Sequence, residues 1–221
     1  MICMIVKRFI VGPLETNCYL VICEDSKESM IIDPGTYGDE YRTVLERVIK
    51  DGLKVKFIVN THGHFDHIMG NRLIKEKTGA SIMIHRQDLA MLTDPSLNLS
   101  RMLGLRVTSP PADIILEDGD TFKVGDEEFR VIHTPGHSRG SVSILGNDAV
   151  FTGDTLFAGS IGRTDLPGSS LRDLTRSIMD KLMRLPDQTK VYPGHGPESL
   201  IGLERRSNPF VKAAEGYRQN F

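Results

Sequence analysis

The chain has 221 residues, of which 39% are hydrophobic and 25% are charged. A chain of this length and composition can bury a substantial core, which excludes an intrinsically disordered protein. Its 27 basic and 29 acidic residues are mixed along the sequence and give a formal net charge of −2. Because no basic field results, nucleic acid is a poor candidate for a partner.

No stretch of the sequence approaches the roughly 20 apolar residues that a membrane-spanning helix needs. The first strand-like run carries Lys7 and Arg8, so we predict neither a signal peptide nor a membrane anchor. Cys3, Cys18 and Cys23 form no CxxC pair, and the last two should lie on opposite faces of one strand. Free thiols in a reducing cytoplasm are the simplest interpretation.

Short strands are predicted for residues 2–33, because β-branched runs there are interrupted by Gly12-Pro13 and by a polar turn at 24–28. A helix should follow and end near Gly52, because five apolar residues recur at helical spacing and would form one stripe against a sheet. The residues of this stripe are Tyr41, Val44, Leu45, Val48 and Ile49.

The alternation of strands and helices continues along the chain. A short apolar strand is predicted at 55–60 and helical character at 68–78, which makes the polar stretch between them a strand-to-helix loop. Further strands, separated by Gly-containing turns, are predicted within 114–133 and 141–152. Residues 91–106 fit either a substrate-facing flap or a covered helix, and we favour the covered helix.

Ser170 and Asp173 have the spacing of a helix N-terminus, so a helix is predicted to start there. A last strand at 190–192 and two short helices should complete the chain. Because no linker or low-complexity stretch interrupts this order, we predict one domain spanning 1–221, with helices covering strands on both outer faces. The apolar side of the helix after Ser170 comprises Leu171, Leu174, Ile178 and Leu182.

The segment Thr61-His62-Gly63-His64-Phe65-Asp66-His67 places four metal-competent side chains within six residues, directly after a predicted strand. Neutral imidazoles and carboxylates suit divalent metals, and a catalytic site uses about three protein ligands per ion with one position open for water. Without a metal, three imidazoles and a carboxylate would be packed together with no partner to offset their desolvation. The segment therefore predicts a metal site.

Four ligands cannot complete two such ions, so others must come from elsewhere. His137, Asp154 and His195 each follow an apolar strand, at the positions where sites are assembled. Singly, each is more simply a turn or capping residue, but the cluster favours ligands. Four of the seven candidates directly follow a glycine, which would let the backbone approach a metal. These four are His64, His137, Asp154 and His195, whereas His85 and His133 are interpreted as structural.

The order and spacing of these residues resemble those of the metallo-β-lactamase superfamily. The segments 133–137 and 151–157 are similar, more narrowly, to its glyoxalase II branch of hydroxyacylglutathione hydrolases. The resemblance covers nearly the whole chain and implies a four-layer αββα sandwich of mixed α/β (α+β) class. It also implies two divalent metal ions, with Zn as the first expectation and Fe or Mn as alternatives.

The resemblance further implies a metal-bridging hydroxide as nucleophile, since a bound divalent ion lowers the pKa of water from 15.7 to about 7. Asp66 would orient this hydroxide and handle its proton. The implied reaction is hydrolysis of a thioester such as S-lactoylglutathione or a related acyl-thiol, whose departing thiolate has a thiol pKa near 8.5. The implied ligands are His62, His64 and His137 for one ion and Asp66, His67 and His195 for the other, with Asp154 bridging.

Two residues outside the ligand set are also candidates. Asp33 ends a strand and would fix a ligand imidazole, although an Asp that starts a turn before Pro34 is an equal alternative. By resemblance, Arg163 stands where the family has a basic substrate contact, whereas Asp165 replaces an aromatic one. An ion-paired surface arginine is the alternative. We expect the chain to lack the full C-terminal helical region with which typical glyoxalase II proteins contact glutathione.

The stretch Gly162-Arg163-Thr164-Asp165 also resembles the persulfide dioxygenases of the superfamily, which use one iron. An oxidoreductase of that type is therefore our second hypothesis. We rank a β-lactamase behind both because of the loop similarities, and a nuclease because no basic face is visible. The expected partner is a small acyl-thiol, with no nucleic acid and no membrane, and the sequence does not indicate an oligomeric state.

Overall fold

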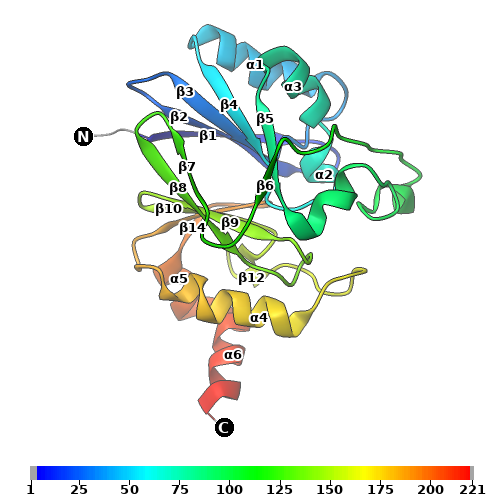
Figure 1. The fold of residues 1–221 in the computed structure, drawn as a ribbon. Helices are drawn as coiled ribbons and strands as arrows, with labels where there is room; N and C mark the ends of the chain where they lie inside the picture. Colours follow the sequence, from blue (N-terminus) through cyan, green and yellow to red (C-terminus); the bar gives the residue numbers. More distant parts are fainter. Residues whose placement is uncertain (1–3, 220–221) are drawn as a thin grey trace.

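Two six-stranded sheets lie face to face and carry helices on their outer faces, in a computed structural model that describes residues 4–219 (Figure 1). This confirms the αββα expectation. Helices α1 and α3 cover the sheet at the top of Figure 1, and α4 and α5 cover the other sheet from below. Cys3, expected as a free thiol, lies outside the described residues. Within residues 4–219, no helix combines the length and apolar character that crossing a membrane requires.

The first sheet has the strand order β1-β2-β3-β4-β5-β6. Its first three strands are antiparallel neighbours and the rest pair in parallel. The strand β5 was not predicted, because its few apolar residues form too short a run to indicate a strand. The strands are β1 (Met4–Val11), β2 (Thr16–Cys23), β3 (Glu28–Ile32), β4 (Lys54–Val59), β5 (Ser81–His85) and β6 (Ile114–Leu116).

The second sheet has the order β14-β13-β10-β9-β8-β7, in which only β10 and β13 pair in parallel. A separate hairpin of β11 and β12 lies beyond the end of β10. The strands are β7 (Thr121–Val124), β8 (Glu127–His133), β9 (Val142–Gly146), β10 (Ala149–Gly153), β11 (Leu156–Phe157), β12 (Ser160–Ile161), β13 (Lys190–Pro193) and β14 (Ser199–Leu200).

Except for α2, the helices occupy the predicted regions, with narrower apolar stripes than expected. The helix α2 lies almost entirely in the stretch between 60 and 68 that was predicted to be a loop. Ile49 is 77% exposed, because it lies about 90° from the centre of the buried stripe at 100° per residue. Leu171, the first residue of its helix, is also exposed and lies outside the apolar cluster that contains Leu174 and Ile178. The helices are α1 (Tyr41–Lys50), α2 (Phe65–Ile68), α3 (Asn71–Thr78), α4 (Leu171–Asp180), α5 (Ile201–Ser207) and α6 (Pro209–Gln219), with 3-10 turns η1 (Gly38–Glu40), η2 (Arg86–Leu92), η3 (Ser100–Leu103) and η4 (Leu182–Arg184).

The prediction of a covered helix at 91–106 is wrong. The region holds the end of η2, an irregular loop and η3, and it leaves Met102 70% and Leu103 57% exposed. Pro95 lacks the N–H that a continuing helix needs, and Asp94 Oδ1 instead accepts a hydrogen bond from the N–H of Ser96 at 2.8 Å.

The core lies in three layers that the sheets separate. Strand β2 is buried on both faces, so its side chains alternate between the layer under α1 and α3 and the layer between the sheets. Cys18 faces the first layer and Cys23 the second, which confirms that they lie on opposite faces of one strand. The third layer lies under α4, α5 and α6. Such burial on both sides of each sheet fixes the register in which the strands pair.

Candidate metal centre

The loop after β4 and the short helix α2 carry four of the expected donors. His62 and His64 lie in the loop, where His64 has extended backbone just before α2. Asp66 and His67 lie within α2. All four side chains are buried, although imidazole and carboxylate groups ordinarily remain in contact with water.

The other three donors come from the second sheet. His137 follows β8, Asp154 follows β10 and His195 follows β13. The two sheets are joined at this edge, because the backbone N–H of Asn17 in β2 donates to the carbonyl oxygen of Gly194 at 2.7 Å. The strand ends of both sheets therefore meet at one place, and the structure brings all seven sequence-predicted donors together.

Asp154 lies in the middle of the donor cluster. Its Oδ1 is 3.5 Å from His67 Nε2, and its Oδ2 is 3.4 Å from His137 Nε2 and 3.6 Å from His195 Nε2. The carboxylate therefore faces donors from both ends of the cluster.

Within the described residues, the donors form three overlapping groups, and in each group the ligand atoms lie within 4.8 Å of one another. Three buried atoms of the cluster, His62 Nε2, His67 Nε2 and Asp154 Oδ1, have no hydrogen-bond partner there. Buried polar atoms without partners are rare, and these donor types bind divalent ions, so the residues present fit a metal. The groups are His62, His64 and His137; His62, His67 and Asp154; and Asp66, His67 and His195.

Two hydrogen bonds from outside the cluster fix the orientation of the imidazoles. Asp33 Oδ2 lies 3.0 Å from His67 Nδ1, which must carry the proton because a carboxylate only accepts. In the same way, His137 Nδ1 donates to the backbone oxygen of Arg163 at 3.0 Å. When these rings are neutral, Nε2 is the unprotonated nitrogen, and in both rings it faces the other donors.

Asp88 supports the centre but is not evident from the sequence. Its buried carboxylate accepts hydrogen bonds from Gly63 N at 3.1 Å, Gly140 N at 2.7 Å and Ser138 Oγ at 2.6 Å. It thereby ties the loop of His62 and His64 to the loop that carries His137. No motif marks Asp88, because its partners are two backbone amides and one hydroxyl from loops distant in the sequence.

The electrostatics of the cluster divide it into two halves. Burial lowers the pKa of His62 well below its ordinary value and that of His64 to about 3, so these imidazoles are neutral. The pKa of His67 is raised well above its ordinary value, since three surrounding carboxylates outweigh the opposing effect of burial. Burial alone would raise the pKa of Asp66, but His67 and His195 lower it well below its ordinary value. The half of the cluster formed by Asp66, His67 and His195 thus favours a bound cation.

A close approach of backbone to a donor is present at one of the four glycines that precede donors. A Cβ on Gly194 would lie 2.2 Å from Asp154 Oδ1, so only glycine leaves room for that carboxylate. The other three have different neighbours, so the expected reason does not apply to them. Gly63 meets Met91, Gly136 meets Leu174 and Gly153 meets Thr61.

Five of the seven donors line a cleft with a volume of about 520 Å³, namely His64, Asp66, His137, Asp154 and His195. Arg163 lies on its wall, where its guanidinium donates to both carboxylate oxygens of Asp165 at 2.7 and 2.8 Å. The predicted substrate residue is thus at the cleft and ion-paired at the same time.

Comparison with known proteins gives a consistent family. Residues 11–195 match a family model described as the metallo-beta-lactamase superfamily. The chain is 41% identical over 209 residues to a probable metallo-hydrolase, YqgX, of Bacillus subtilis, covering 93% of this chain and 96% of that one. It is 34% identical over 211 residues to the hydroxyacylglutathione hydrolase GloC of Haemophilus influenzae, covering 92% and 96%.

Solved structures agree with this family. The BLEG-1 B3 metallo-beta-lactamase superposes with a TM-score of 0.89 at 38% identity, covering 94% of this chain and 99% of that one. TTHA1623 in a di-iron-bound form gives 0.80 at 38% identity, covering 92% and 99%. ETHE1 from Myxococcus xanthus gives 0.78 at 28% identity, covering 96% and 91%.

Proposed function

Because this chain belongs to the metallo-β-lactamase superfamily and is a metallo-hydrolase of that family, we propose that it hydrolyses thioesters of small molecules, such as S-lactoylglutathione or a related acyl-thiol. The main support is that the carboxylate of Asp154 lies within 3.6 Å of His67, His137 and His195, which belong to two separate groups of three donors. The likeness to a hydroxyacylglutathione hydrolase at 34% identity supports the choice of a thioester.

We propose that two divalent ions occupy the centre, with zinc as the first choice and iron or manganese as alternatives. One similar protein is di-iron-bound, which keeps iron in consideration. Bound divalent ions would lower the pKa of a coordinated water to about 7 and so supply a nucleophile at neutral pH. The ligands would be His62, His64 and His137 at one ion and Asp66, His67 and His195 at the other, with Asp154 between them.

Asp66 is the proposed catalytic residue. It lines the cleft, its Oδ2 accepts a hydrogen bond from Thr16 Oγ1 at 3.1 Å, and its depressed pKa keeps it ionised and able to orient water. Attack of water on the carbonyl carbon breaks the C–S bond and yields a carboxylic acid and a thiol. The leaving thiolate needs little protonation, because thiols ionise near pH 8.5.

Arg163 is a proposed substrate contact at the rim of the cleft. We further propose that no nucleic acid or membrane takes part and that the protein acts in a reducing cytoplasm, in keeping with its buried free thiols.

The test is thiol release from S-lactoylglutathione and from S-acetyl-N-acetylcysteamine by protein loaded with zinc. Release should stop when a chelator removes the metal and return when zinc is added. Asp66→Asn should lower the rate by at least about 100-fold, the lower end for a general base. The matched change Asp25→Asn in an exposed turn should leave the rate unchanged.

A protein that holds two metal ions per chain and releases thiol from neither thioester would overturn the proposal. Oxygen consumption with glutathione persulfide by the iron-loaded protein would instead favour the dioxygenase hypothesis, which the likeness to ETHE1 keeps open. Cleavage of a chromogenic β-lactam without thioester cleavage would favour an activity like that of the similar B3 metallo-beta-lactamase.

A further inference from the structure

Apolar side chains line the cleft together with five of the metal donors. We call six of these side chains the apolar wall, namely Leu14, Leu99, Met102, Leu103, Phe157 and Ile161. Phe157 and Ile161 belong to the hairpin that follows the donor Asp154, so the wall begins next to the donors. A group attached to a carbonyl held at the donors would therefore contact the wall.

The loop that carries Leu99, Met102 and Leu103 is held in place by hydrogen bonds of Asn98. The buried side chain of Asn98 donates to the backbone oxygens of Met91 at 2.9 Å and Val107 at 3.0 Å. Its own backbone oxygen accepts the N–H of Phe65, the first residue of α2, at 3.0 Å. The loop is thus tied to the helix that carries two of the donors, and its position relative to the centre is defined.

The fixed loop nevertheless presents large apolar side chains to solvent. Met102 is 70% and Leu103 57% exposed, and both line the cleft. Large apolar side chains exposed in a cleft usually mark a binding site. Since the same side chains border the metal donors, the occupant is a part of the substrate close to the reacting carbonyl.

The cleft offers little to a charged peptide thiol. Among the described residues that line it, Arg163 is the one lysine or arginine, and its charge is already paired with Asp165 through hydrogen bonds from Nε and Nη2. Glutathione carries two carboxylates, whose removal from water needs free cationic partners. An apolar group, in contrast, is stabilised by contact with this wall without needing a charged or hydrogen-bonding partner.

We propose that the physiological substrate is a thioester whose acyl group is a hydrocarbon chain, bound along the apolar wall. This specificity rests on the proposed thioester hydrolysis and adds the substrate class to it. Met102 and Leu103 are the specificity-determining residues, because they are the most exposed apolar side chains of the wall.

The test uses one small neutral thiol, N-acetylcysteamine, carrying acetyl, butanoyl or hexanoyl groups, with zinc-loaded protein. For the wild type, kcat/KM should rise about two- to fourfold for each added methylene, so that hexanoyl exceeds acetyl by at least about 16-fold. Hexanoate should also inhibit more tightly than acetate, which provides a second readout. The double change Met102→Ser and Leu103→Ser should reduce the hexanoyl-to-acetyl ratio below about fourfold, because it removes apolar area from the wall.

The matched control is Ile49→Ser, an equally exposed apolar residue on α1 that does not line the cleft, and it should leave the ratio unchanged. A ratio near one for the wild type, or a preference for S-lactoylglutathione over the hexanoyl thioester, would overturn the hydrocarbon specificity while thioester hydrolysis stands. If none of the thioesters is cleaved, both proposals are wrong.

Discussion

Asp33 supports two parts of the centre with one carboxylate. Its Oδ2 lies 3.0 Å from His67 Nδ1, and its Oδ1 accepts the N–H of Thr61 at 2.8 Å. We predict that Asp33→Asn weakens zinc binding by about 10- to 100-fold, because an amide holds the imidazole N–H less strongly than a carboxylate does. Competition with a chelator of known affinity measures the change.

The variant should fold, since Asp33 has a φ of +50° that asparagine adopts as readily as aspartate. The exposed Asp25→Asn serves as the control and should bind zinc like the wild type. Equal zinc affinity in Asp33→Asn would mean that the orientation of His67 does not depend on this carboxylate.

The pair of Arg163 and Asp165 determines how much positive charge the rim offers to a substrate. The two hydrogen bonds from Arg163 lower the pKa of Asp165 to about 2, so the carboxylate is ionised at every working pH. We predict that Asp165→Asn raises kcat/KM for S-lactoylglutathione by about two- to fivefold at low salt, because a freed guanidinium can meet a substrate carboxylate. The gain should shrink as salt is added, and a loss of activity would contradict it.

His85 and His133, interpreted as structural from the sequence, stack with ring centroids 4.0 Å apart and belong to none of the donor groups. Burial, followed by His133, lowers the pKa of His85 to about 4. Between pH 6.5 and 4 His85 therefore binds a proton in the unfolded chain but not in the folded protein. The free energy of unfolding consequently falls as pH falls. We predict that, between pH 7 and pH 5, the free energy of unfolding falls by about 1 to 2 kcal/mol more in the wild type than in His85→Gln. Urea unfolding of both metal-free proteins tests this, and equal losses would contradict it.

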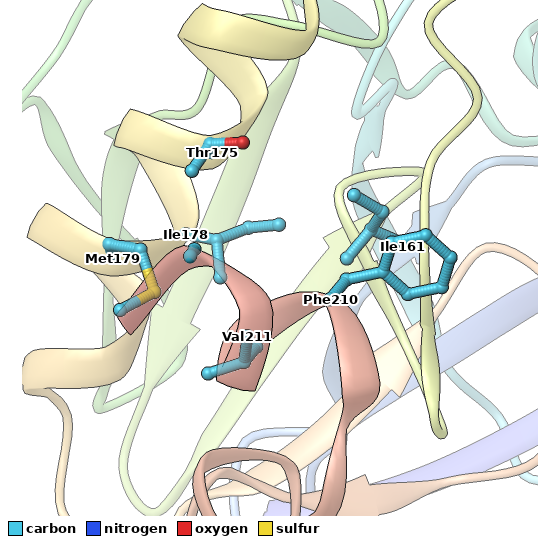
Figure 2. A pocket seen from close by; sticks show the side chains of 7 residues that line it. Ile161, Thr175, Ile178, Met179, Phe210 and Val211 are labelled. Carbon is cyan, nitrogen blue, oxygen red and sulfur yellow. The ribbon is translucent and has the colours of Figure 1, made fainter. Parts of the chain in front are cut away.

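At the scale of elements, the C-terminal helices hold the hairpin of β11 and β12 against the centre. The buried carboxylate of Glu204 in α5 accepts hydrogen bonds from Ser199 Oγ, from Gly159 N at 2.9 Å and from Asn208 Nδ2 at 2.7 Å. In Figure 2, Phe210 of α6 lies beside Ile161 of β12, and the cavity that they share with α4 has a volume of only about 10 Å³. The helices therefore pack against Ile161, which also lines the cleft.

We predict that Glu204→Gln lowers the free energy of unfolding by about 1 to 3 kcal/mol, because an amide cannot accept all three hydrogen bonds. For a chain of this size, Tm should fall by about 2 to 4 °C for each kcal/mol. The KM for thioesters should rise as the hairpin loosens. The exposed Glu198→Gln is the matched control, and a Tm equal to the wild type in Glu204→Gln would exclude this role.

At the scale of the whole molecule, the centre lies where both sheets and α2 meet, so metal binding should stabilise the entire fold. An ion present at about a thousand times its Kd adds about 4 kcal/mol to the stability of the folded state. We therefore predict that a chelator lowers Tm by about 8 to 16 °C and that added zinc restores it. Calorimetry with and without chelator measures the shift. Asp154→Asn, which removes the carboxylate in the middle of the donor cluster, should show a smaller shift, and a Tm insensitive to chelator would contradict a metal between the sheets.

Local sequence features predicted most elements and the donor set. The apolar runs of β2 and β4 and the cap formed by Ser170, whose Oγ accepts the N–H of Asp173 at 3.2 Å, depend on neighbours in the chain. The density of imidazoles at 62–67 also indicates a metal by itself, because burying such groups without a partner is costly.

Other features were decided only by tertiary structure. Asp88 and Glu204 became part of the supporting network because loops distant in the sequence supply their hydrogen-bond donors. The apolar wall could not be predicted from the sequence either. Periodicity alone does not distinguish an apolar side chain that is buried, such as Leu92, from one that faces a cleft, such as Met102. The sequence by itself determined the fold class and the donor types, which local patterns encode. Which side chains surround the donors depends on where two separate sheets meet, and that was set only when the chain folded.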